Sequence, residues 1–427
     1  MDYTEALEYL DRHIALGVKP GLERIEGLLD DMGRPDDGYP VIHVAGTNGK
    51  TSTSRFATIL LVAHGLSTGT YTSPHLEKIE ERLSINGKVA TEEEFALAVS
   101  DVAAFALLRE KGGAEANTYF ELTTAAAFAL FAERAVNAAV LEVGLGGRLD
   151  ATNVVDAEVC VLTSIGIEHT EYLGEDVATI AGEKLAIAGP NSILVSGPLP
   201  DEALEVAETR ARELGIHHRH YGKDFSVLDA ERGVGGWLAT IAGAEETYED
   251  LFLPLHGRYQ LVNLANAVAA TEALLGRKLD EEAVRAAVAT ATVPGRMEVV
   301  GTKPLVMLDG AHNADGVSVL ADSLEEEYPT TRWQLVLGVM GDKNVEAMMV
   351  SLAPLVDGVV TTAPASERSV PPSQLAERIA DLVDAPVLVA EEVELAIDMA
   401  RAEAGPDGAV LIAGSLYLVG EARKLLV

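Results

Sequence analysis

Short apolar runs alternate with helical patterns along almost the whole chain, and this alternation restricts the fold more than any other feature. The early apolar runs include PVIHVAG, NAAVLEVG, EVCVLTSIG and SILVSG, and the later ones include PLVMLDG, RWQLVLGVM and GAVLIAG. Strands that alternate with helices favour βαβ units and mainly parallel sheets. The sequence therefore predicts an α/β protein.

A chain of 427 residues is too long for one ordinary core, so we expect two domains. Pro294 and Gly295 punctuate the chain in TVPGR, and we place the boundary there. Residues 1–293 are predicted to form the larger domain, with a small β excursion within 217–255. Residues 294–427 have the cleaner alternation of a compact doubly wound, Rossmann-like domain.

The chain is strongly acidic, with 67 Asp and Glu against 32 Lys and Arg and a net charge of −35. Nucleic-acid binding needs clustered positive charge, so that class of function is excluded. The acidic residues are spread through helical stretches such as TEEEF and DSLEEEYP rather than gathered in a tail. We interpret this as a surface adapted to high salt, and the alternative is an ordinary acidic enzyme.

Nothing in the sequence indicates a membrane segment or an exported protein. No apolar run reaches transmembrane length, and the first residues, MDYTEALEYLDRHIALG, are acidic rather than basic and then apolar. The single cysteine, Cys160, lies in an apolar run and cannot form an internal disulfide. We expect a cytoplasmic monomer.

The stretch VIHVAGTNGKTSTSR, residues 41–55, predicts a strand, a phosphate-binding turn and a helix. The usual signature has a glycine five positions before Gly49, where this chain has Val44. The physical requirements are nevertheless present, because glycines let backbone N–H groups approach phosphate oxygens at a helix N-terminus. Lys50 can reach the β- and γ-phosphates and Thr51 can bind Mg²⁺. A plain tight turn would need the glycines but not Gly-Lys-Thr-Ser.

Three further side chains follow predicted strands. Ser73 follows a short strand in YTSPHL, Glu142 ends the strand of LEVGLGG, and His169 follows TSIGIE. Ligands bind at the carboxyl ends of parallel strands, and a hard cation prefers oxygen ligands, so these three residues could complete a Mg²⁺ site. Taken singly, each has a plainer explanation, such as a helix-capping Glu or an ordinary surface His.

Several motifs occur in a fixed order: GTNGK, TSPHL, EVGLGGRLDATN, IGIEH, PGRMEV, LDGAHN and GSLYLVGEAR. Together they resemble the folylpolyglutamate synthase/dihydrofolate synthase family of the Mur ligase superfamily. The resemblance covers nearly the whole chain and implies a Mur-ligase-like P-loop domain followed by a glutamate-ligase domain. TSPHL and DGAHN are the more family-specific motifs, whereas the loop and GRME are shared with peptidoglycan Mur ligases.

The resemblance implies a role for each matching residue. Lys184, in AGEKLAIAGP, matches a lysine that such enzymes carry as a carbamate, and His312 matches a residue near the transferring phosphoryl group. Without the family, Lys184 would be taken as an ordinary surface lysine. The implied ATP contacts are Gly46, Thr47, Asn48, Gly49, Lys50, Thr51, Ser52, Asn263, Arg296 and Asp309. The implied metal ligands are Thr51, Ser73, Glu142 and His169, and the implied pterin contacts are Thr118, Tyr119, Phe120, Leu149, Asp150 and Ala151.

The implied reaction activates a carboxylate by transfer of the γ-phosphoryl group of ATP, and the amine of L-glutamate then attacks the acyl phosphate. The implied cofactors are ATP and Mg²⁺, with K⁺ as a candidate further ion. Dihydrofolate synthesis and folate-tail extension differ only in the carboxylate substrate, and we favour a bifunctional enzyme. A Mur-type ligase for another amino acid and a nucleotide-dependent switch protein are the alternatives.

The chain departs from the family pattern at two places. It has Gly-Lys-Thr-Ser where the family usually has Gly-Lys-Gly-Ser, and GRYQ at 257–260 where a His-Gln pair is common. A hydroxyl at Thr51 suits Mg²⁺, so the first change is compatible with catalysis. The second change, at residues 257–260, affects the residues that the resemblance places around the adenine of ATP.

Overall fold

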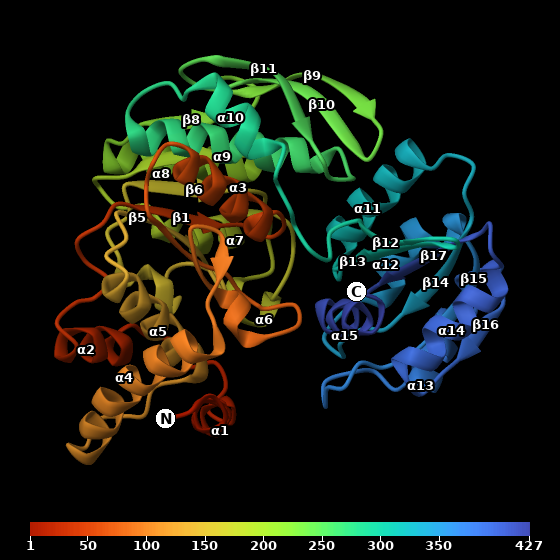
Figure 1. Ribbon diagram of the computed structural model, residues 1–427, viewed down its shortest axis with the longest axis horizontal. Helices are drawn as coiled ribbons and strands as arrows, with labels where there is room; N and C mark the ends of the chain where they lie inside the picture. Colours follow the sequence, from red (N-terminus) through yellow and green to blue (C-terminus); the bar gives the residue numbers. More distant parts are fainter. The chain divides into compact units, whose positions relative to one another are not determined.

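The computed structural model describes residues 1–427, and the chain divides into two compact units (Figure 1). The first unit contains residues 1–75, 79–254 and 261–291, and the second contains 76–78, 255–260 and 292–427. The α/β fold predicted from the sequence is confirmed. The two short segments of the second unit differ from the single boundary at residue 293. They are too short to carry a periodic pattern that a sequence could reveal.

The first unit is built on an eight-stranded sheet with the order β4-β3-β2-β5-β1-β6-β7-β8. The six strands from β2 to β8 in this order are parallel, and β3 and β4 add an antiparallel edge. The central strands are apolar and completely buried, as expected for a parallel sheet. The strands are β1 Val41–Ala45, β2 Thr68–Tyr71, β3 Leu83–Ile85, β4 Lys88–Val89, β5 Ala138–Glu142, β6 Val159–Leu162, β7 Ile193–Ser196 and β8 His218–His220.

Helices cover this sheet. α5 packs on β2 with α1, α2 and α4 around it, while α3 packs on β1, β2 and β5, and α10 packs on α3. α5 is Ala-rich and apolar on almost every side, and it is buried along most of its length. The helices are α1 Tyr3–Ile14, α2 Glu23–Asp31, α3 Lys50–Ala63, α4 Glu92–Lys111, α5 Tyr119–Glu133, α6 Thr170–Leu173, α7 Val177–Lys184, α8 Asp201–Leu214, α9 Tyr259–Leu275 and α10 Glu281–Val288, with 3₁₀ turns η1 Ile79–Arg82, η2 Ala151–Val154 and η3 Leu185–Ile187.

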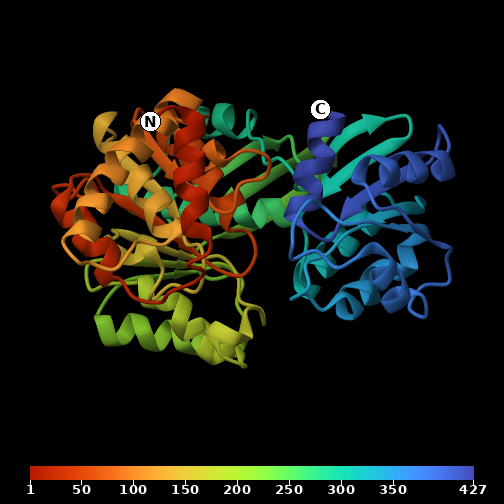
Figure 2. The same ribbon diagram turned by 90° about the horizontal axis from the view of Figure 1, so that it is seen from below.

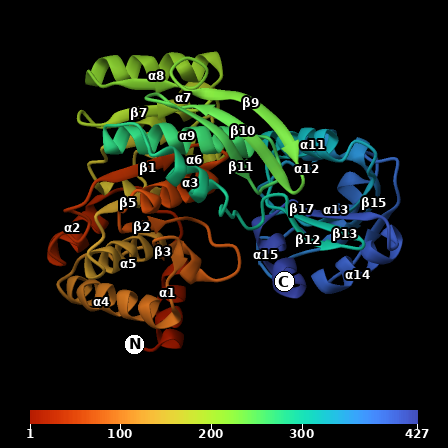
Figure 3. The ribbon, with the colours of Figure 1, turned by 45° about the horizontal axis from the view of Figure 1, so that its top comes forward.

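The predicted β excursion is a separate antiparallel sheet of three strands, seen as long ribbons in Figure 3. Its order is β11-β10-β9, and β10 pairs with both neighbours. Alternate residues of β10 are buried, as expected for a strand with one covered face, and in β11 two consecutive exposed residues, Glu249 and Asp250, interrupt the same pattern. The strands are β9 Ser226–Gly233, β10 Gly236–Ala242 and β11 Thr247–Leu253.

The second unit has a six-stranded sheet with the order β12-β13-β17-β14-β15-β16. All neighbours are parallel except the edge strand β12, which the sequence did not reveal. Apolar side chains form a separate core on each face of the sheet, which confirms the doubly wound architecture. The strands are β12 Glu298–Thr302, β13 Leu305–Asp309, β14 Trp333–Leu337, β15 Val356–Thr361, β16 Val387–Val389 and β17 Ala409–Ala413.

The helices of the second unit lie on both faces of its sheet. α11 and α12 contribute to one core with α13, and α14 and α15 contribute to the other. α15 also contacts the edge formed by β12 and β13 (Figure 2). The helices are α11 Ala314–Glu327, α12 Val345–Leu352, α13 Pro372–Ile379, α14 Val393–Ala404 and α15 Leu416–Leu426, with a 3₁₀ turn η4 Ala353–Leu355.

The segment 76–78 is fixed to the second unit by charge and by close packing. Arg423 of α15 pairs with Glu77, and its Nε lies 3.0 Å from a carboxylate oxygen of Glu298. A Cβ atom at Gly420 would collide with the backbone of Leu76, so only glycine fits there.

None of the helices combines the length with the apolar composition that crossing a membrane requires.

Candidate active site

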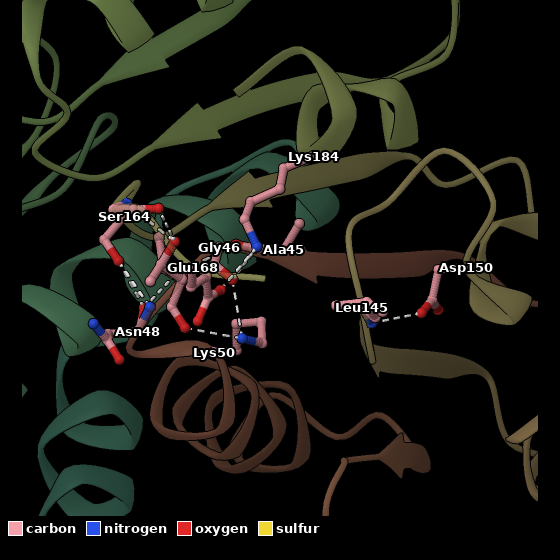
Figure 4. Close-up of polar contacts among 12 residues, drawn as sticks. Ala45, Gly46, Asn48, Lys50, Leu145, Asp150, Ser164, Glu168 and Lys184 are labelled. Atoms are coloured by element: carbon pink, nitrogen blue, oxygen red, sulfur yellow. Dashed lines mark hydrogen bonds and ion pairs between the residues drawn. The ribbon is translucent and has the colours of Figure 1, made fainter. Parts of the chain in front are cut away.

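The predicted phosphate loop, residues 46–49, connects β1 to α3 (Figure 4). Gly46 and Gly49 have φ of 148° and 86°, values that side chains rarely adopt. A Cβ at Gly46 would collide with the Thr163 hydroxyl, and one at Gly49 would collide with the side chain of Asn263 on α9. Both positions therefore require glycine, because side chains from other parts of the protein come too close for a Cβ atom. Asn263 lies directly against the loop.

The loop is held in shape by the residues that follow β6. Ser164 O accepts from Thr47 N at 2.9 Å, and Ser164 Oγ accepts from Asn48 N at 3.0 Å. The Thr163 hydroxyl donates to Asn48 O at 2.7 Å. These contacts fix the backbone of the loop before any ligand arrives, which lowers the cost of ordering it on binding.

Two lysines converge on this loop. Lys50 Nζ donates to Gly46 O at 2.9 Å and to Thr47 O at 3.0 Å. Lys184, at the end of α7, donates from Nζ to the same Gly46 O at 3.0 Å and pairs with Glu168 at 3.2 Å. Figure 4 shows both ammonium groups directed at the start of the loop.

Lys184 is 3% exposed, so the plainer explanation of a surface lysine is wrong. Burial, and then the neighbouring charge of Lys50, lower the pKa of Lys184 from its ordinary 10.5 to about 8, although Glu168 acts in the opposite direction. Burial alone would raise the pKa of Glu168, but the charges of Lys50, Lys184 and His169 hold it below its ordinary value. Glu168 was not predicted from the sequence.

Three of the four predicted metal residues meet at one point. The Thr51 hydroxyl donates to Glu142 at 2.9 and 3.0 Å from the two carboxylate oxygens, and Ser73 N lies 3.3 Å from Glu142 Oε2. Glu142 is 1% exposed, at the end of β5. The Ser73 hydroxyl is buried and has no hydrogen-bond partner. This set of oxygen donors, one of them unsatisfied, fits a hard cation such as Mg²⁺.

His169, the fourth residue, is exposed and precedes α6 in a left-handed conformation with φ of 49°. No three His, Cys, Asp or Glu side chains are grouped as a metal site. A cation at Glu142 would thus take much of its coordination from hydroxyls, water and a ligand, as Mg²⁺ commonly does.

The predicted pterin residues at the start of α5 lie among aromatic side chains. Thr118 caps α5, with Glu121 completing the capping box. The Phe120 ring lies 5.9 Å from that of Tyr71, and a Cβ at Gly144 would collide with it. The ring of Tyr119 lies below the Arg82 guanidinium at 5.4 Å.

Arg82 was not predicted from the sequence. It is 7% exposed, and its Nε lies 3.0 Å from His75 Nδ1. A buried guanidinium beside aromatic rings suits an anionic or planar ligand. Its surroundings come from 3₁₀ turn η1 and from α5, which only the fold brings together.

Asp150 has a structural use in this fold. Its carboxylate accepts from Leu145 N at 2.8 Å and from Thr152 N at 3.0 Å, so it ties the glycine-rich turn after β5 to η2. Burial raises the pKa of Asp150, and the hydrogen bonds from Thr152 and the backbone act against this effect. Leu149 beside it is half exposed, and Ala151 is buried.

The second unit holds its own group of predicted residues at the carboxyl end of β13. The Asp309 carboxylate accepts from Met297 N at 2.9 Å and from Ala311 N at 2.8 Å. Burial raises the pKa of Asp309, and the charge of Arg296 opposes this effect. His312 Nδ1 donates to Gly310 O at 2.7 Å in the same turn. Arg296, Asp309 and His312 are therefore neighbours, as expected if all three serve one ligand.

Comparison with known families accounts for both units. The Mur ligase middle domain matches residues 44–271, and the Mur ligase glutamate ligase domain matches residues 295–416. The dihydrofolate synthase/folylpolyglutamate synthase of Mycobacterium tuberculosis is 38% identical over 96% of this chain and 90% of its own length. This chain belongs to the dihydrofolate synthase/folylpolyglutamate synthase family of Mur ligases.

Solved structures agree with this assignment. The folylpolyglutamate synthase of Mycobacterium tuberculosis, complexed with ADP, has a TM-score of 0.94 and 37% identity, and the match covers 100% of this chain and 99% of that one. The FolC of E. coli, in complex with DHPP and ADP, has a TM-score of 0.88 and 31% identity, with 100% and 97% covered. The resemblance inferred from the motifs is confirmed.

Proposed function

We propose that this protein is an ATP-dependent ligase that joins L-glutamate to dihydropteroate, to the glutamate tail of a reduced folate, or to both. The observation that carries the proposal is the group formed by loop 46–49, Lys50, Lys184 and the oxygen donors Thr51, Ser73 and Glu142. Family membership supports it, and related synthases have been solved with ADP and with DHPP.

The residues suit activation of a carboxylate by ATP. Loop 46–49 would bind the phosphates through its N–H groups, and Lys50 would exchange its carbonyl partners for phosphate oxygens. Thr51, Ser73 and Glu142, with His169, would hold Mg²⁺. When bound, Mg²⁺ would neutralise charge on the transferring phosphoryl group. Arg296, Asp309 and His312 would contribute nucleotide and phosphoryl contacts.

The acyl phosphate made from ATP is reactive enough for the amide bond to glutamate to form without a second ATP. Transfer of the γ-phosphoryl group to the substrate carboxylate gives an acyl phosphate, which has a good leaving group. The amine of L-glutamate attacks the acyl carbon, phosphate leaves, and the amine loses a proton. Catalysis in such a sequence comes mainly from positioning and charge stabilisation rather than from a protein nucleophile.

The direct test is incorporation of labelled glutamate with MgATP, in buffers from low to molar KCl. Incorporation with dihydropteroate, tetrahydrofolate or both is expected, and each result assigns the carboxylate substrate. A lack of incorporation with either would refute the proposal, and incorporation of another amino acid would favour a Mur-type ligase. The salt series also tests the high-salt interpretation of the acidic surface, because screening should raise the activity if the interpretation is correct.

We further propose that Lys184 is carbamylated. Carbamate formation requires the neutral amine, which attacks CO₂ and releases a proton. With a pKa of about 8, roughly a tenth of the Lys184 amine is neutral at pH 7, against roughly three in ten thousand for an ordinary lysine. The product would be an anion in place of the ammonium that pairs with Glu168, so Lys50 or a cation would have to balance the two negative charges. Such an anion would be suited to orient a substrate or a metal-bound water.

We expect ¹³C-labelled bicarbonate to give a carbamate signal in the carbon NMR spectrum of the wild-type protein and to give none in Lys184→Arg. The Lys184→Arg variant should lose about a hundredfold in turnover. Lys278→Arg, at an exposed ion pair with Glu246, is the matched control and should behave as wild type. Full turnover of wild-type protein in CO₂-free buffer, with no carbamate signal, would contradict the proposal.

A further inference from the structure

The segment 255–260 belongs to the second unit, although the chain before and after it belongs to the first. Glu327, the last residue of α11, holds this segment. Glu327 Oε2 accepts from His256 Nδ1 at 2.6 Å, and Glu327 Oε1 accepts from Gly257 N at 2.5 Å. Glu327 is 5% exposed. Charge-assisted hydrogen bonds of this kind, shielded from water, are among the stronger polar contacts in a protein.

The two N–H groups of the segment, His256 Nδ1 and Gly257 N, are both held by the Glu327 carboxylate. Each oxygen of Glu327 accepts from a different N–H group, so both oxygens must be acceptors. A glutamine at this position could still accept from Gly257 N, but its NH₂ group would reach His256 Nδ1 only as an uncharged donor to the other histidine tautomer. The side-chain volume would hardly change, so Glu327→Gln removes the negative charge that holds both N–H groups while keeping the packing.

Segment 255–260 turns sharply after the two residues that Glu327 holds. Gly257 has φ of 84°, and Gln260 N donates back to Gly257 O at 3.0 Å. A Cβ at Gly257 would collide with the ring of Tyr259 and lie 3.0 Å from Met297 Sδ. The turn therefore folds Tyr259 back over Gly257, and the position of Gly257 sets the position of the Tyr259 ring.

Tyr259 in turn contacts the predicted nucleotide residues of the second unit. Its ring packs against the apolar core that contains Met297. Against the effect of burial, the Tyr259 hydroxyl lowers the pKa of the Asp309 carboxyl, and the charge of Arg296 lowers the pKa of both groups. Asp309 holds Met297 N and Ala311 N, which lie in the two turns that carry Arg296 and His312. Tyr259 is also the residue at which this chain departs from the His-Gln pair common in the family.

We propose that Glu327 is a positioning residue for nucleotide binding: it fixes the 255–260 turn so that Tyr259 orients Asp309 and Arg296. The inference rests on the proposed function only in taking Asp309 and Arg296 as nucleotide contacts. Glu327 itself touches neither substrate nor nucleotide in this scheme, and it acts through the turn. Its removal should therefore weaken nucleotide binding and leave the binding of the other substrates unchanged.

The test compares Glu327→Gln with wild type in steady-state kinetics and in calorimetric titration with ADP. We expect the KM for ATP and the Kd for ADP to rise about tenfold, as for other residues that orient a ligand contact. The kcat and the KM for glutamate should stay within about twofold of wild type. Tyr259→Phe should weaken ADP binding in the same way, and the double variant should weaken it by less than the product of the two single effects.

Glu325→Gln is the matched control, because Glu325 is an exposed glutamate of the same helix, two residues before Glu327. It should leave all constants unchanged. An unchanged Kd for ADP in Glu327→Gln would overturn the inference, as would independent effects of Glu327→Gln and Tyr259→Phe. A lowered melting temperature with a smaller active fraction but normal KM values would indicate a purely structural role and would also overturn it.

The calorimetric readout separates this inference from the proposed function. If wild type binds ADP but incorporates no glutamate, the proposed ligase activity fails, and the ADP titrations of the variants still decide the role of Glu327. If wild type incorporates glutamate and Glu327→Gln binds ADP normally, the inference on Glu327 fails alone.

Discussion

Lys50→Ala should lower turnover by on the order of 10³-fold, the loss typical of removing a group that stabilises transition-state charge. The Lys50 ammonium lies over the loop through its contacts with Gly46 O and Thr47 O, where the phosphates are expected. Its charge also lowers the pKa of Lys184. The substitution should therefore also reduce the neutral fraction of the Lys184 amine, and with it the carbamate. Glutamate incorporation and the ¹³C carbamate signal measure the two effects.

Lys278→Ala, at an exposed ion pair, is the control for loss of one positive charge on an acidic protein. Its turnover should remain that of wild type. Lys50→Arg keeps the positive charge but places it on a planar guanidinium group, which is wider than an ammonium group. This variant should therefore recover little activity. Retention of more than about a tenth of wild-type turnover in Lys50→Ala would contradict the assigned role.

Glu142→Gln should lower turnover by a similar factor, on the order of 10³-fold, because it weakens the metal site. The substitution preserves the shape of the side chain but removes the only carboxylate that meets Thr51 and Ser73. A neutral amide binds Mg²⁺ more weakly than a carboxylate does. The Mg²⁺ concentration for half-maximal activity should therefore rise, while metal-free ADP binding should persist.

Glu93→Gln on the exposed first turn of α4 removes the same charge at a distance from the site and serves as the control. A melting curve for Glu142→Gln distinguishes a lost metal site from a lost fold, because Glu142 is buried. An unchanged Mg²⁺ dependence in a folded Glu142→Gln protein would refute the metal role.

The fold could be predicted from the sequence to a large extent, because its strands are apolar and its helices are periodic. PVIHVAG, NAAVLEVG and EVCVLTSIG became β1, β5 and β6 at the centre of the sheet. The antiparallel edge strand β12 was missed, since its residues are only half buried and carry no strong apolar pattern. An edge strand has one neighbour and needs less apolar sequence than a central one.

The site could be predicted where a residue's place follows from strand order alone. Glu142 and Thr51 meet because β1 and β5 are adjacent and parallel, and both residues lie near the carboxyl ends of these strands. Glu168 and Arg82 were missed because their importance comes from burial beside other charges and rings. The sequence shows only a carboxylate next to a histidine and an arginine in an acidic stretch. Which groups lose water is decided by tertiary packing.

The short segments 76–78 and 255–260 restrict how chimeras could be built from two members of the family. A chimera with a single crossover at residue 293 would combine the His256 and Gly257 of one parent with the α11 carboxylate of the other, and likewise Glu77 with a foreign Arg423. A mismatch at either place would leave a largely buried charge without its partner. A functional chimera therefore requires that both segments be exchanged together with the C-terminal part.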